Sequence, residues 1–150
     1  MTAAVLIFMG VAVAQQVPAG WKVMKSERGT CQVAVPSDWA VDNDFSTAND
    51  PKKLVSVTIL HEQDAKMGPS ESDAMRIAAY TPIKVFENTS RRVFLEDKVS
   101  AFGPSGPPRR KFVAFVPHTS KGICQAMTIL KSGGPEALAK QVALTVSAVR

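Results

Sequence analysis

The sequence predicts an α+β fold in which an antiparallel β-sheet of about six to seven strands is flanked by helices. Segments with apolar residues at every second position recur along the chain, and the connections between most of them are too short for the crossover that parallel strands need. Two other segments place apolar residues at helical spacing, and helices are needed to cover the apolar faces of such a sheet. A chain of 150 residues is expected to form one domain.

The first residues predict export. Residues 3–13 are uncharged and almost wholly apolar, and Ala12–Ala14 before Gln15 match the small-x-small pattern that signal peptidase cleaves. The run is too short to span a bilayer, which takes about 20 apolar residues. A buried N-terminal strand or helix is the alternative. We expect a periplasmic or extracellular protein without a transmembrane segment after cleavage, divided into a signal peptide (1–14), a flexible leader (15–20) and a single α+β domain (21–150).

The stretch from Gly29 to Trp39 predicts the core of the fold. Cys31, Val33 and Val35 lie on one face of a strand of period two, and Pro36 ends the strand because it cannot donate to a sheet ladder. Trp39 follows a tight turn and is expected to fill the core. A strand over 21–25 and a turn over 26–29 place the first two strands in a hairpin.

The middle of the chain mixes strands, loops and one helix. A short strand is expected over 39–42, then a loop over 42–51, because this part is rich in Asp and Asn side chains that compete with regular structure. Residues 54–60 alternate as a strand. A helix is expected to begin at Ser70–Asp73 and to end at Thr81-Pro82, residues 83–88 are ambiguous, and a strand covers 92–99.

The last third predicts two strands and a helix. Residues 102–108 are rich in Gly and Pro and form a loop tip, and strands over 110–116 and 123–130 are joined by a turn over 117–122. A helix follows Pro135. Its apolar stripe is expected to pack on the sheet through Leu138, Val142, Thr145, Val146 and Val149.

The two cysteines, Cys31 and Cys124, both lie in predicted strands. In an oxidising compartment an even pair is a candidate disulfide. Closing a loop of this length would contribute about 4–5 kcal/mol in the chain-entropy model. Two buried free thiols are the alternative.

The net charge of +5 comes from basic residues that are spread in pairs. Without a clustered basic footprint or a reading module, no nucleic-acid partner is expected. If the strands that carry them pair, one set could form a basic edge for an anionic partner, although charged edges also block aggregation. This set consists of Arg91, Arg92, Arg109, Arg110 and Lys111.

The loop over 42–51 carries the strongest resemblance to a metal site. Asp42 and Asp44 are spaced as in a calcium loop, but Thr47 and Lys53 occupy the positions of the required glycine and glutamate. A solvated turn is therefore expected instead, and no metal is predicted.

The histidines provide no recognisable catalytic motif. His61 is followed by Glu62 at a strand end and His118 lies in a turn, and neither belongs to a nucleophile motif. The Gly133-Gly134 pair lacks the lysine and spacing of a phosphate loop. No catalytic residue and no cofactor are predicted.

The segment Val33-Ala-Val-Pro-Ser-Asp-Trp39, followed by a Val/Ile strand, a helix, three strands and a terminal helix, resembles the PsbP-like family. This family contains photosystem extrinsic proteins, a nuclear Ran-binding protein and exported bacterial proteins of unknown role. The resemblance implies an α/β/α sandwich and a binding or assembly role rather than an enzymatic one.

The sequence therefore favours an exported, non-enzymatic domain that binds a protein or envelope partner through a sheet edge and the loops. One alternative is an envelope hydrolase that uses His61 or His118 with a carboxylate. Another is a protein that holds a small apolar or anionic ligand between sheet and helix.

Overall fold

The computed structural model describes residues 17–64, 80, 82–98, 109–119 and 121–149. Strands make up 54% of these residues and form two antiparallel sheets, whereas a single short helix is present in this part of the chain. The predicted helix-flanked α+β sandwich is therefore wrong, and the described chain is mostly β. The predicted helix over 70–79, the signal peptide and the loop tip over 102–108 lie outside the described residues.

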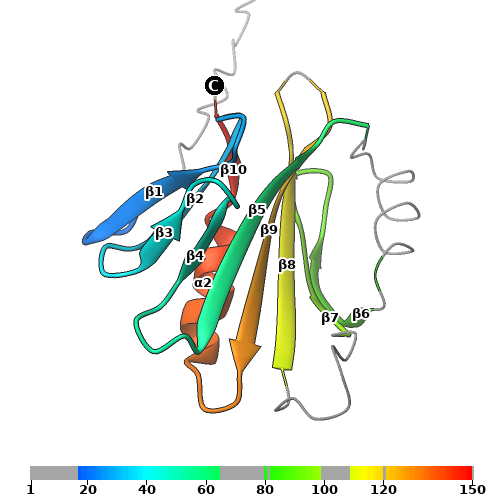
Figure 1. Ribbon diagram of the computed structural model, residues 1–150. Helices are drawn as coiled ribbons and strands as arrows, with labels where there is room; N and C mark the ends of the chain where they lie inside the picture. Colours follow the sequence, from blue (N-terminus) through cyan, green and yellow to red (C-terminus); the bar gives the residue numbers. More distant parts are fainter. Residues whose placement is uncertain (1–16, 65–79, 81, 99–108, 120, 150) are drawn as a thin grey trace, which may run out of the picture.

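The larger sheet has seven antiparallel strands, and β3 and β6 are its edges (Figure 1). The central pairs β5–β9 and β8–β9 run in register along most of their length. In spatial order the strands are β3 (Ala40–Asp42), β4 (Thr47–Asn49), β5 (Val55–Glu62), β9 (Ile123–Lys131), β8 (Arg109–Pro117), β7 (Val93–Asp97) and β6 (Pro82–Asn88).

The smaller sheet places β2 (Cys31–Pro36) between β1 (Trp21–Lys25) and β10 (Ser147–Ala148). The β1–β2 hairpin and the end of β2 at Pro36 confirm the prediction from the sequence. The sequence does not predict β10, because the apolar stripe after Pro135 continues at helical spacing to Val149 and predicts a helix over this whole segment.

The helix α2 (Glu136–Leu144) ends earlier than its apolar stripe. The Thr145 hydroxyl donates to Val142 O at 2.7 Å and accepts from Ala34 N at 2.9 Å, so this side chain joins the helix end to β2. The following residues leave the helix and pair with β2 as β10.

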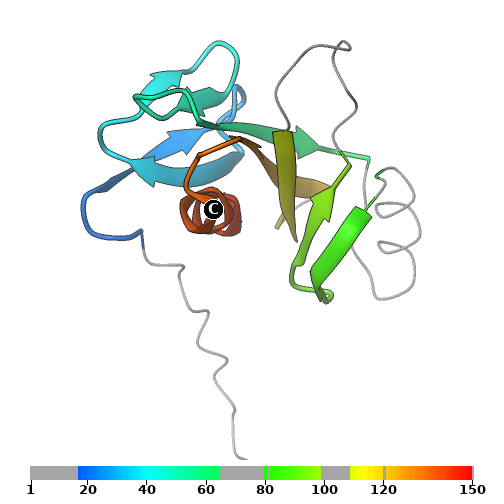
Figure 2. The ribbon, with the colours of Figure 1, turned by 90° about the horizontal axis from the view of Figure 1, so that it is seen from below.

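The core lies between the large sheet, α2 and the small sheet. Figure 2 shows α2 end-on inside the curve of the large sheet, with the β1–β2 hairpin on one side and β7–β6 on the other. Trp39 is only 2% exposed, which confirms its predicted place in the core. The predicted inward face of β5 is also buried, through Val55, Val57 and Ile59.

The opposite face of the sheet carries a second apolar cluster over β7, β8 and the start of β9. Its buried members are Val93, Leu95, Val113, Phe115 and Ile123. Both faces of β7 and of the middle of β8 are therefore covered, which explains why every residue of β7 is buried.

The predicted loop over 42–51 contains the strand β4, so that part of the prediction is wrong. Thr47 and Asn49 pair with Thr58 and Ser56 of β5. Ala48 and Asn49 have weak strand propensity, so their place in a strand is a tertiary effect, because the neighbouring β5 supplies the ladder. Among the described residues, no helix is long and apolar enough to cross a bilayer.

Candidate functional site

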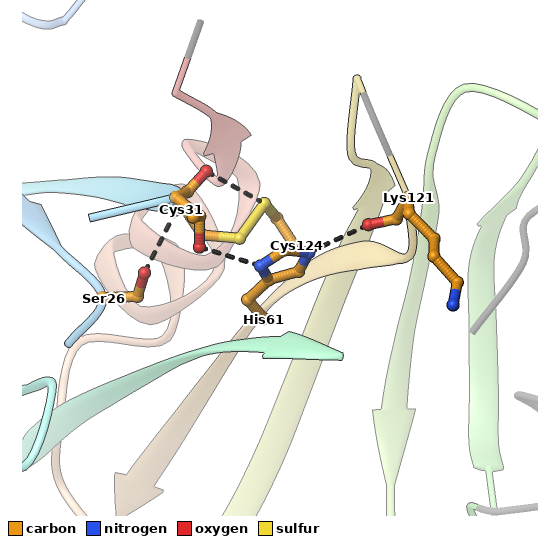
Figure 3. The surroundings of a disulfide bond; sticks show 6 residues. Ser26, Cys31, His61, Lys121 and Cys124 are labelled. Carbon is orange, nitrogen blue, oxygen red and sulfur yellow. Dashed lines mark hydrogen bonds between the residues drawn. A yellow bond between two sulfur atoms is a disulfide. The ribbon is translucent and has the colours of Figure 1, made fainter. Parts of the chain in front are cut away.

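A disulfide joins the two sheets near one end of the molecule. Cys31 at the start of β2 and Cys124 in β9 have sulfur atoms 2.01 Å apart, and neither residue has exposed surface (Figure 3). Of the two possibilities left open by the sequence, the structure has the disulfide and not the two buried free thiols. Because both sulfur atoms are bonded and buried, neither cysteine can act as a nucleophile in this state.

His61 is held rigidly beside the disulfide, opposite Cys124 in the β5–β9 register. Its Nε2 lies 3.0 Å from Lys121 O, and because a carbonyl oxygen only accepts, Nε2 donates (Figure 3). In the neutral ring Nδ1 then accepts from the Thr30 hydroxyl at 2.8 Å. His118 stacks on the ring with centroids 4.4 Å apart. Both nitrogens of His61 are thus engaged, which does not favour its predicted alternative role as a general base.

An open recess of about 390 Å³ lies at this end of the molecule. Three segments that are distant in sequence form it: the β1–β2 turn, the β3–β4 turn and the end of β5. Its lining is mostly polar and consists of Ser26, Glu27, Arg28, Ser46, Ile59, Leu60, His61, Gln63 and Asp64. We call residues 26–28, 42–46 and 60–64 the turn surface.

A hydrogen bond from a backbone N–H to a serine hydroxyl joins the first two segments of the turn surface. Glu27 N donates to Ser46 Oγ at 2.8 Å, which fastens the β1–β2 turn to the β3–β4 turn. The Ser26 hydroxyl accepts from Cys31 N at 3.1 Å, and Gly29 adopts the positive φ of 66° that this turn requires. The recess is therefore built on the disulfide-linked strand.

Ser46 fixes the β3–β4 turn. It is 5% exposed and has a φ of 51°, a left-handed conformation that is uncommon for residues other than glycine. Its carbonyl accepts from Ile59 N at 3.0 Å, and its N–H donates to Asn43 O at 3.3 Å. The surrounding bonds hold this conformation in place.

Phe45 projects from that turn and is the most exposed large apolar side chain in the described part of the chain, at 74%. The Asp42 carboxylate accepts from Asp44 N at 3.1 Å and from Phe45 N at 3.4 Å. Asp42 therefore acts as a turn cap, as expected for a solvated turn. Leu60, 42% exposed, is a further apolar residue of the turn surface.

A second open hollow, of about 530 Å³, lies along the same hairpin. It is lined by Ala40, Val41, Asp42, Asn43, Asp44 and Asn49. The β3–β4 turn thus contributes residues to both polar hollows. Within the described residues, no three His, Cys, Asp or Glu side chains are grouped closely enough to hold a metal ion.

The five basic residues of the predicted edge are not brought together. β7 and β8 pair as the prediction required, but Val93 lies opposite Phe115 and Asp97 opposite Lys111. The antiparallel register places the two arginines before β7 seven and eight residues, or about 23–27 Å, along the strands from Arg109. β6 also covers β7, so neither β7 nor β8 is an edge.

Three of these basic residues form ion pairs instead. Arg92 lies 2.7 Å from Glu87, and Lys111 lies 2.5 Å from the nearly buried Asp97. Arg110 bridges Glu96 at 2.6 Å and Glu136 at 2.5 Å, while Arg91 and Arg109 are exposed. Binding of an anion by this set stays a prediction that the arrangement does not favour.

Arg110 connects the sheet to the start of α2. Its hydrogen bonds lower the pKa of the Glu96 carboxyl and lower that of Glu136 to about 2, where a hydrogen bond from Lys140 adds to the effect. The two carboxylates in turn raise the pKa of Arg110. The network keeps all of these groups charged and fixes the helix on the sheet.

The interface between sheet and helix is filled by side chains. Ala139, Val142 and Ala143 of α2 have no exposed surface, and they belong to one cluster with the inward side chains of β5, β8 and β9. This packing counts against the alternative of a ligand between sheet and helix.

No protein-family model matches the sequence, and no curated protein matches it either. A crystal structure of a protein from Bacteroides thetaiotaomicron VPI-5482 has a similar fold, with a TM-score of 0.56 and 13% sequence identity. The similarity covers 87% of this chain and 49% of that protein, so the chain spans about half its length. At this level of identity the likeness shows the fold alone.

Sequence reasoning missed the residues that shape the turn surface. Phe45 lies in a segment predicted as a loop, and the sequence does not identify its ring as a binding element. The bond from Glu27 to Ser46 depends on two hairpins meeting in space. The dense run of Asp and Asn around Phe45 was the available signal, since it indicates a solvent-exposed turn.

Proposed function

We propose that this chain is an exported binding domain that engages a partner protein through the turn surface, with Phe45 as the anchoring side chain. The proposal involves no chemical step. The role in binding or assembly expected from the sequence is kept. The proposed binding site is the set of three segments beside the disulfide and no longer a sheet edge.

The exposure of Phe45 is the observation that carries the proposal. An aromatic ring that is 74% exposed gains little from folding, yet the turn beneath it is fixed by the bonds of Asp42 and Ser46. A rigid aromatic side chain loses little conformational entropy on binding, and such residues often dominate the energy of protein interfaces. The neighbouring recess offers room for side chains of the partner.

The disulfide supports the same role in two ways, through the cellular compartment that it indicates and through the rigidity that it gives to the site. The disulfide between Cys31 and Cys124 is of the kind that persists in oxidising compartments, which fits the expected periplasmic or extracellular location. It also stiffens the base of the turn surface, because Cys31 follows directly on the β1–β2 turn. The resemblance to PsbP-like proteins, carried by the Pro-x-x-Trp hairpin, stays a prediction that implies a binding role, although the α/β/α sandwich that it also implies is not the observed fold.

Site-specific photo-crosslinking tests the proposal. A photoreactive phenylalanine analogue at position 45 is expected to form one defined adduct in the envelope or secreted fraction of the producing organism, and mass spectrometry would identify the partner. The same analogue at Ile83, an exposed apolar position on β6 that is 68% exposed, is the matched control and is expected to give no such adduct.

Binding of the purified partner then gives the decisive number. Phe45→Ala is expected to weaken binding tenfold or more, equivalent to about 1.4 kcal/mol, while Ile83→Ala changes it less than twofold. Thermal unfolding should confirm that both variants remain folded. Equal affinities of wild type and Phe45→Ala, or a Phe45 adduct that Ile83 gives as well, would refute the turn surface as the binding site.

A further inference from the structure

We infer that the partner presents a basic segment to the turn surface and that a lysine or arginine side chain of this segment lies over the ring of Phe45. The inference rests on the proposed function and adds the chemistry of the partner.

Carboxylates surround Phe45 although the whole chain carries a net charge of +5. Asp42 and Asp44 lie on the same turn, and the bond from Glu27 N to Ser46 Oγ brings a third acidic residue beside it. The second oxygen of the Asp42 carboxylate makes no hydrogen bond among the described residues, since the turn uses only Oδ1. The turn around Phe45 is thus acidic and attracts cations, although the chain as a whole is positively charged.

The cations near the recess do not cancel this field. Lys121 lies 3.5 Å from Asp64, so this pair is close to neutral. Arg28 lines the recess on the side of the β1–β2 turn. Acidic side chains still outnumber basic ones over the turn surface and its neighbour Lys121.

Two other sites in this protein combine a phenylalanine ring with a neighbouring carboxylate, and both bind a cationic side chain. Lys140 lies 4.6 Å from the ring centroid of Phe86 and pairs with Glu136, and the Arg110 guanidinium lies 5.1 Å from the centroid of Phe112 and pairs with Glu96. In each case a carboxylate holds a cation over a phenylalanine face, where the ring quadrupole attracts it.

Phe45 has the ring and the carboxylates of this arrangement, and among the described residues no cation lies over it. An apolar anchor would leave the flanking Asp42 and Asp44 carboxylates without compensation as the partner excludes water. A lysine or arginine side chain satisfies ring and carboxylates together. The structure therefore favours a basic partner segment over an apolar or acidic one.

A pair of short peptides tests this inference. The probe is Gly-Arg-Gly-Arg-Gly, and its control replaces both arginines by citrulline, which has the same shape without the charge. In ¹⁵N-labelled protein at low salt, the arginine peptide is expected to shift the amide signals of residues 42–46 and to bind at least tenfold more tightly than the citrulline peptide. Its affinity should fall as salt is added.

Three variants separate the contributions. Phe45→Leu keeps an apolar side chain but removes the ring, and it is expected to weaken arginine-peptide binding about two- to fivefold. Asp44→Asn should weaken it by a similar factor, because it removes a charge with little change of shape. Asp38→Asn removes an equally exposed charge on the β2–β3 turn and should change binding less than 1.5-fold.

Equal binding of the two peptides, or unchanged binding by both Phe45→Leu and Asp44→Asn, would overturn the inference. If the identified partner requires Phe45 while the arginine peptide binds no better than its control, the binding function stands and only the basic character of the partner is refuted. If Phe45→Ala leaves partner binding unchanged, both proposals fail together.

Discussion

Removal of the disulfide should cost this protein a large part of its stability. The perturbation is the double substitution Cys31→Ala and Cys124→Ala, which leaves two small apolar side chains at positions that are fully buried. The bridge links residues 93 positions apart. In the chain-entropy model, a closed loop of that length contributes about 4.6 kcal/mol at 25 °C.

Packing adds to this loss. Deletion of both sulfur atoms removes buried contacts between β2 and β9, and each deleted group of that size costs about 1 kcal/mol. The total expected loss is therefore about 6–7 kcal/mol, which is comparable to the whole stability of many domains. The double variant should be largely unfolded at 37 °C or lose most of its resistance to urea.

Equilibrium unfolding in urea, followed by tryptophan fluorescence, measures the effect. The oxidised wild type, the reduced wild type and the double variant should be compared, because reduction tests the bridge without new side chains. Hydrogen exchange should show that amides of β1 and β2 lose protection before those of β8 and β9. A loss below about 2 kcal/mol in both the reduced protein and the variant would refute the bridge as a major constraint on the unfolded chain.

Three further perturbations test the packing and the charge network. Gly122→Ala should destabilise the fold by about 3 kcal/mol or more in urea unfolding, because φ is +86° and the added Cβ would lie 2.1 Å from the backbone oxygen of Glu62. Gly29→Ala is the control, since Gly29 has a φ of +66° but open space around it, and it should cost about 1 kcal/mol. Trp39→Ala should cost about 3–5 kcal/mol in the same assay, since the ring is buried, and a loss under 1 kcal/mol would contradict its place in the core. The pKa of Glu136 in the folded protein is lowered from 4.5 to about 2 by Arg110, so the stability that this ion pair contributes is present above pH 4.5 and is lost as the pH falls toward 2. Glu136→Gln should therefore reduce the pH dependence of the free energy of unfolding between pH 4.5 and 2. An unchanged pH dependence in this range would argue against the pairing.

Local pattern was sufficient for much of the fold. The alternation of Cys31, Val33 and Val35 and the stop at Pro36 predict β2 correctly, because side-chain period and the missing N–H of proline are local properties. The same holds for β5, β8 and β9, whose predicted ranges differ from the observed ones by a residue or two.

The errors come from interactions between distant segments. β4 forms because β5 provides a ladder for Thr47 and Asn49, and α2 stops early because Thr145 binds Ala34 on another strand. Neither partner can be recognised in the local sequence. The number of sheets was missed for the same reason, since the second neighbour of β2 is β10, near the end of the chain.

The candidate site was the least predictable part. The sequence directed attention to titratable residues, and the structure shows that many of them serve the architecture: His61 bonds through both ring nitrogens, and Arg110 holds a helix. The exposure of Phe45 depends on how two hairpins meet. A solvent-exposed aromatic residue in a polar turn differs from a buried one only in its three-dimensional surroundings.

The distance along the chain between the two bridged cysteines has a consequence for biogenesis. In the export that we propose, the chain crosses the membrane from its N-terminus and exposes Cys31 well before Cys124, so the thiol of Cys31 would stay unpaired until most of the chain has been translocated. β2 obtains its last neighbour, β10, even later. With only two cysteines in the sequence, a single intramolecular pairing exists, so maturation needs an oxidant but no reshuffling of wrong disulfides.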